Sequence, residues 1–63
     1  MRTHEYSVTV AIKSKKHGDE SEFDRLIRAE SDIVAEHKAE VAVASEFEPG
    51  VVIVRALRVT RVG

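Results

Sequence analysis

Hydrophobic and polar residues alternate along the first segment of the chain, residues 3–13. One face of this segment would carry His4, Tyr6, Val8, Val10 and Ile12. A period of two with β-branched and aromatic residues is typical of a half-buried β-strand. A polar run follows and ends at Gly18, which can adopt the positive φ of a tight turn. We therefore predict a strand over residues 3–13 followed by a turn.

The next segment has the features of a helix start. Asp19 can cap the free amides of a first helical turn, and Glu22, three residues later, completes a capping-box-like pair. Apolar residues then recur at roughly helical spacing, at Phe23, Leu26, Ile27, Ile33, Val34 and Val41. We predict a helix over about residues 20–38. Residues 39–47 fit either a strand or an extension of this helix, because their apolar residues alternate while Ala and Glu are also good helix formers.

The C-terminal third contains the strongest strand signal. Pro49 and Gly50 suit the two central positions of a type II turn, and residues 51–62 are rich in Val, Ile and Arg. Apolar residues on both faces favour a central position for this last strand. The chain is thus expected to form a single small α+β domain, residues 1–63, with the order strand-helix-strand-strand. One helix would pack on one face of a three-stranded antiparallel sheet.

One helix can cover only one face of such a sheet, so the other face needs a different partner. The apolar residues expected there are Val51, Ile53, Leu57, Val59, Ala42 and Ala44. Isolated proteins seldom leave a large apolar patch in water, and the commonest solution is a closed homo-oligomer. We expect self-association, with a dimer favoured, and these six residues as the interface with a second copy or a protein partner.

The net charge of −1 conceals a segregation of charge along the chain. Every acidic residue except Glu5 lies within 18–48, and residues 49–63 carry arginines but no acid. Candidate contacts for a nucleic acid are Lys13, Lys15, Lys16, Arg55, Arg58 and Arg61. On a regular strand Arg55 and Arg61 would share a face opposite to Arg58, so they form no single stripe. With few aromatic residues for base stacking, the sequence does not favour nucleic-acid binding.

Catalytic, cofactor and metal sites find no support in the sequence. There is no cysteine, the histidines lack a spacing that would bring two ligands together, and no nucleophile or phosphate-loop motif is present. Even the apolar run Val51–Val54 is far shorter than the roughly 20 residues of a membrane helix. A cytoplasmic location is expected because no export signal is visible. These observations predict a non-enzymatic, self-associating interaction module of accessory or regulatory type. The alternatives are a nucleic-acid-binding module and an oligomeric enzyme or ligand carrier with sites between subunits.

Overall fold

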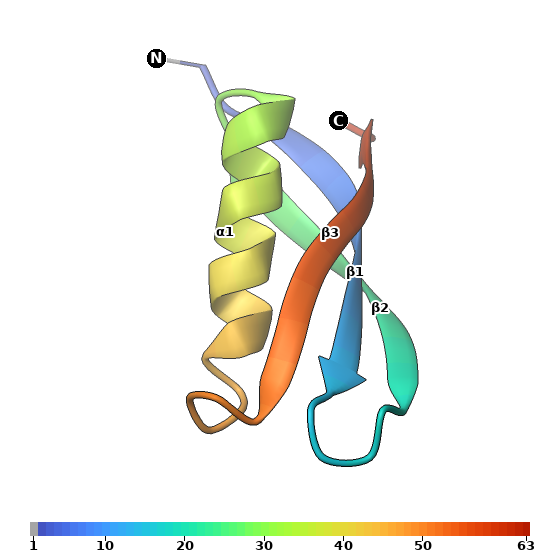
Figure 1. The fold of residues 1–63 in the computed structure, drawn as a ribbon. Coiled ribbons are helices and arrows are strands. Elements are labelled where there is room, and N and C mark those ends of the chain that lie inside the picture. The colour runs from blue at the N-terminus through green and yellow to red at the C-terminus, as the bar shows by residue number, and fades with distance from the viewer. Residues whose placement is uncertain (1) are drawn as a thin grey trace.

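The computed structural model describes residues 2–63, which form three strands and one helix (Figure 1). Along the chain these are β1 (His4–Ser14), β2 (Glu20–Ala29), α1 (Asp32–Ala44) and β3 (Val52–Arg61). The strands form one antiparallel sheet in the order β2-β1-β3, and α1 packs on one side of it. The expected α+β class, with one helix and a three-stranded antiparallel sheet, is confirmed.

The order of the elements differs from the prediction, because residues 20–29 form strand β2 and not a helix. Phe23 and Ile27 are four residues apart, a spacing that fits one face of a helix and one face of a strand equally well. Pairing with β1 decides between them, since the two strands stay in register from His4 opposite Ala29 to Lys13 opposite Glu20. Tertiary pairing therefore overrides the local helical signal.

The turn predicted near Gly18 is present and joins β1 to β2. The Ser14 amide donates to the Asp19 carbonyl (2.9 Å), and the Gly18 amide donates to the Ser14 carbonyl (2.8 Å). Gly18 has φ of +74°, a backbone conformation that residues with a Cβ rarely adopt. Asp19 thus closes a hairpin and does not cap a helix.

Helix α1 begins later than predicted. Ser31 is its N-cap and its hydroxyl accepts a hydrogen bond from the Val34 amide (3.3 Å). The helix ends at Ala44, so of residues 39–47 the first six are helical and the last three belong to the connection to β3. In that connection the Val51 amide donates to the Glu48 carbonyl (3.2 Å), and Gly50 has φ of +83°. This is the predicted type II turn, but it joins a helix to a strand and not two strands.

Strand β1 occupies the centre of the sheet, and β3, predicted to be central, lies at an edge. The β1–β3 register is interrupted by a bulge. Thr9 pairs with Arg58 and Val10 with Ala56, which leaves Leu57 without a partner on β1. Beside the bulge, the Ala56 amide donates to the Glu40 carboxylate of α1 (3.1 Å). This hydrogen bond links the helix to the edge strand β3 and satisfies one backbone amide of that strand.

The core lies between α1 and the sheet. The side of β1 predicted to be apolar faces the helix, and Val8 and Val10 are fully buried. The helix contributes only Ala35, Ala39 and Val43, which are small enough to let it approach the sheet closely. A helix of 13 residues is about 20 Å long, whereas a strand of 11 residues spans about 36 Å. The sheet therefore outreaches the helix, and the molecule is elongated, with extents of 40 × 17 × 14 Å.

Candidate interaction surfaces

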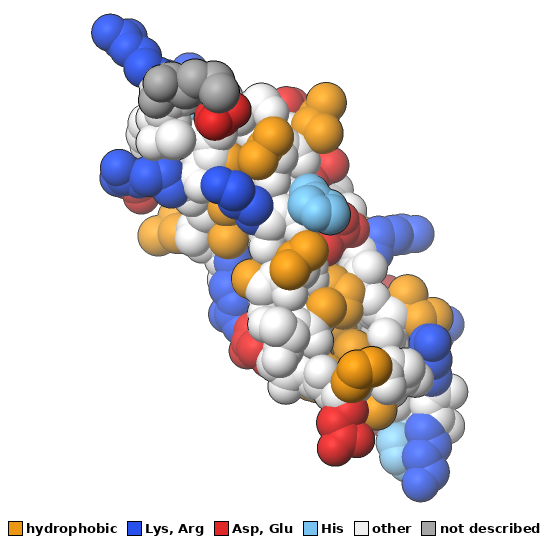
Figure 2. All heavy atoms as spheres, turned by 90° about the vertical axis from the view of Figure 1, so that its left-hand side faces the viewer, with side chains coloured by type: hydrophobic (Ala, Val, Ile, Leu, Met, Phe, Trp, Pro, Cys, Tyr) orange, Lys and Arg blue, Asp and Glu red, His pale blue; other side chains and the backbone are white. Residues whose placement is uncertain are grey.

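The face of α1 that points away from the sheet is mostly apolar, with His37 at its centre. We call it the outer stripe, and it consists of Ile33, Val34, His37, Val41 and Ala44, which fall on one side of the helix at 3.6 residues per turn. Ile33 is 74% exposed and Val41 is 55% exposed, whereas Ala35 and Ala39 on the inward side are fully buried. Figure 2 looks onto the helix side of the molecule and shows hydrophobic side chains at its surface. The helix thus buries Ala35, Ala39 and Val43 against the sheet and leaves Ile33, Val34 and Val41 in solvent.

This arrangement is unusual for a helix on the surface of a complete assembly. A surface helix normally carries apolar residues toward the core and polar residues toward water. A helix that is apolar on both sides is typically covered on both sides. The outer stripe is therefore a candidate contact surface.

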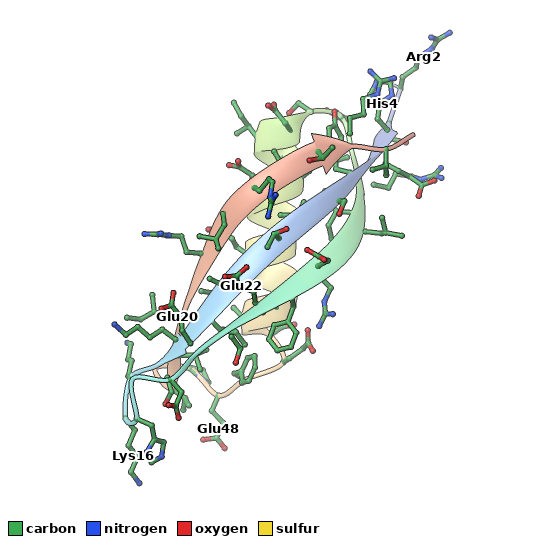
Figure 3. All side chains as sticks on the ribbon, turned by 90° about the vertical axis from the view of Figure 1, so that its right-hand side faces the viewer. Arg2, His4, Lys16, Glu20, Glu22 and Glu48 are labelled. Carbon is green, nitrogen blue, oxygen red and sulfur yellow. The ribbon has the colours of Figure 1, made fainter. Side chains whose placement is uncertain are left out.

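The second candidate is the sheet face opposite α1, which we call the open face (Figure 3). The strand registers arrange its side chains in three columns. Strand β2 contributes the acidic column, Glu20, Glu22 and Asp24. Strand β1 contributes small residues in the middle, Ser7, Thr9 and Ala11. Strand β3 contributes the basic column, Arg55 and Arg58.

The acidic and basic columns do not neutralise each other within the chain. Between them lies β1, so they are about 10 Å apart. Within residues 2–63 the ion pairs are Arg25–Glu46 (2.7 Å) and Arg28–Glu5 (3.4 Å), and neither joins the two columns. Asp24 accepts a hydrogen bond from the Thr9 hydroxyl (2.7 Å). Two shallow hollows, of about 200 and 350 Å³, lie on this face over the middle column.

The six residues expected to form one apolar sheet face are spread over the molecule. Ala42 and Ala44 are exposed residues of α1, because the segment predicted as a strand is helical. Val51 lies in the type II turn. Val59 packs against the core. Ile53 (52% exposed) and Leu57 are exposed residues of β3, and Ile53 stands on the open face among charged residues. The expected continuous patch is therefore absent from the open face as described.

The bulge also changes which arginines share a face. Arg55 and Arg58 both lie on the open face, and Arg61, paired with Tyr6, lies on the helix side. The prediction that Arg55 and Arg61 share a face is wrong, because Leu57 adds one residue to the strand between them. Lys13 is on the open face opposite Glu20, while Lys15 and Lys16 lie in the β1–β2 turn (Figure 3). The positive side chains of the open face thus stand beside an acidic column that would repel phosphate.

A third hollow, about 440 Å³, lies between the start of α1 and the ends of β1 and β3. It is lined by His4, Tyr6, Glu30, Ser31, Asp32, Val59 and Arg61. Acidic and basic groups are mixed in it, and no side chain of residues 2–63 is both charged and buried. Across the described chain, His, Asp and Glu nowhere gather in threes at a distance suited to a metal ion.

The one helix of the described residues is too short and too polar to cross a bilayer. Comparisons of the sequence with protein-family models, and of the chain with curated proteins and with solved structures, find no match. The surfaces of the molecule therefore carry the functional argument.

Proposed function

We propose that this protein is a non-enzymatic interaction module that self-associates through the outer stripe of α1. The observation that carries the proposal is the distribution of side chains on the helix, with Ala35 and Ala39 facing inward while Ile33 and Val41 face outward. Exposing these side chains opposes the hydrophobic effect, about 25 cal/mol for each Å² of apolar surface. A partner that covers the stripe removes that cost.

A second copy of the chain fits this surface through twofold symmetry. Ile33 and Val41 lie four residues before and four residues after His37. When two α1 helices pack antiparallel about an axis near His37, Ile33 of one copy lies opposite Val41 of the other, and the reverse holds on the other side. Such an interface is isologous and closes at two copies. Ala44 lies on the same stripe and permits close approach of the helices near their ends.

The small core supports the same proposal. Val8, Val10 and Val43 are the largest side chains that are fully buried. A domain of about 60 residues buries only about 60% of the surface of its unfolded chain, and oligomerisation is a common way to bury more. Association through α1 would cover the helix on both sides and add its outer residues to the buried apolar surface.

Sedimentation equilibrium at about 0.5 M sodium chloride tests the proposal, because charge-driven contacts are screened at that ionic strength. We expect a mass of twice the 7.0 kDa chain. The double variant Ile33→Lys/Val41→Lys should have the mass of a single chain, since it places like charges in the contact. The control is Val51→Lys, which adds the same charge at an exposed apolar residue of the type II turn, outside both surfaces. Circular dichroism checks that each variant is folded.

Two results would overturn the proposal. One is a wild-type chain that remains monomeric at concentrations up to about 1 mM, where an interface worth only about 4 kcal/mol would already be populated. The other is a double variant that associates as strongly as the wild type and the Val51→Lys control.

A further inference from the structure

We infer that the open face is a second self-association surface, on which the acidic column of one copy lies over the basic column of another. This second interface is independent of the helix, because it follows from the strand registers and from the charges they bring together. It goes beyond the proposed function by assigning an occupant, a second copy of this chain, to the opposite side of the molecule.

The registers place the charges in rows across the sheet. One row is Glu22, Ala11 and Arg55, and the next is Asp24, Thr9 and Arg58. In both rows the acid is on β2, the base is on β3, and the residue between them is small. The bulge at Leu57 makes the second row possible, because without it the residue paired with Thr9 would be Leu57.

A twofold axis parallel to β1 and lying in front of the open face turns this pattern onto itself. The rotation places β2 of one copy above β3 of the other while each residue stays level with its own row. Glu22 then faces Arg55 of the second copy, and Asp24 faces Arg58. Each contact occurs twice by symmetry. Aligned sheets pack about 10 Å apart with their strands turned by about 30°, so the rows nearest the point where the strands of the two copies cross stay aligned best.

The alternative twofold axis, perpendicular to the strands, is disfavoured by the same charges. It stacks β2 on β2 and β3 on β3, and therefore brings Asp24 near Asp24 of the second copy and Arg58 near Arg58. Like charges placed together suppress a binding mode. The charge pattern thus selects one orientation out of two.

The middle column allows the two faces to meet. Ser7, Thr9 and Ala11 are short, so β1 of one copy can approach β1 of the other while the longer Glu and Arg side chains reach across at the sides. The hollows of about 200 and 350 Å³ over this column leave space for those side chains. The charged groups are free to form these contacts, since neither of the ion pairs within residues 2–63 involves Glu22, Arg55 or Arg58.

Charge reversal at the first row tests the inference, by sedimentation velocity at about 0.02 M and 0.5 M salt. Glu22→Arg gives a face that is basic on both sides in this row, and Arg55→Glu gives one that is acidic on both sides. We expect each single variant to associate through the open face at least about tenfold more weakly than the wild type at low salt. The double variant Glu22→Arg/Arg55→Glu should recover the wild-type affinity, and an equimolar mixture of the two single variants should associate.

The variant Ile33→Lys/Val41→Lys separates this interface from the one on α1. In that background the inference expects salt-sensitive dimers, and their absence at low salt overturns it while leaving the helix contact to be judged on its own. Failure of the double variant to recover affinity also overturns it, because the two charges then do not face each other. Salt-sensitive dimers that respond as described to the three charge variants and to the mixture of the two single variants support it even if the helix contact fails.

Discussion

Replacing Ala39 with leucine tests whether α1 really presents its small residues to the sheet. Ala39 is fully buried between the helix and the strands, so three additional carbon atoms have no space there. Overpacking a well-packed core costs about 1–3 kcal/mol. A domain of this size has a free energy of unfolding of only about 3–9 kcal/mol, from about 0.05–0.15 kcal/mol per residue. The substitution would therefore remove a large share of the stability.

The matched control is Ala42→Leu, which makes the same chemical change at an exposed position of the same helix. Leucine is nearly as good a helix former as alanine, so the control should change stability by less than about 0.5 kcal/mol. Thermal unfolding followed by circular dichroism at a fixed protein concentration measures both variants. At about 4–8 °C per kcal/mol, Ala39→Leu should lower Tm by about 5–20 °C. Equal effects of the two substitutions would refute the orientation of the helix and with it the outer stripe.

Two further predictions concern the backbone of the connections and the helix start. Gly50→Ala should destabilise the domain by about 1 kcal/mol, because φ of +83° is unfavourable for L-alanine although a Cβ would meet no atom within 4 Å. A chemically synthesised chain with D-alanine at this position should be at least as stable as the wild type. If urea unfolding shows the L-alanine chain to be more stable than the D-alanine chain, the type II turn is contradicted. Ser31→Ala should lower the free energy of unfolding by about 1 kcal/mol, because it removes the hydrogen bond from the Val34 amide. Ser31→Asp should retain most of the stability. Equal losses of stability for the two variants in the same urea assay would argue against Ser31 as the N-cap.

The strand β1 and both glycine turns could be predicted from the sequence because their signals are local and point to one structure. Alternation over residues 4–12 has no helical interpretation, and Gly18 and Gly50 each stand in a short polar or proline-containing run. Strand β2 could not be predicted in the same way. Its apolar residues fit both periods, and Asp19 with Glu22 forms a plausible helix start. The competing structure depends on hydrogen bonds to β1, which a local pattern does not contain.

The error in the predicted helix bounds also affected which residues were expected at the interface. With residues 20–38 taken as helical, Val41 and its neighbours became a strand, and the outward face of the true helix was divided between two predicted elements. The charge segregation along the chain was visible, but its arrangement on the open face was not. That arrangement needs the pairing of β2 with β1 and the extra residue at Leu57. Two-residue alternation had placed Arg58 on the opposite side from Arg55.

Leu57 reverses the alternation of side chains between the two faces of β3. Upstream of it the odd-numbered residues Ile53 and Arg55 belong to the open face, and downstream the even-numbered residues Arg58 and Thr60 do. Deleting this single leucine would remove the bulge and leave every later side chain on its present side, with Arg58 still opposite Thr9 and Val59 still opposite Val8. Deleting a regularly paired residue such as Val54 would instead shift the register by one and exchange the inner and outer surfaces of part of the strand. A change of one residue in the length of β3 is therefore compatible with the fold at the bulge and not within the regularly paired parts of the strand.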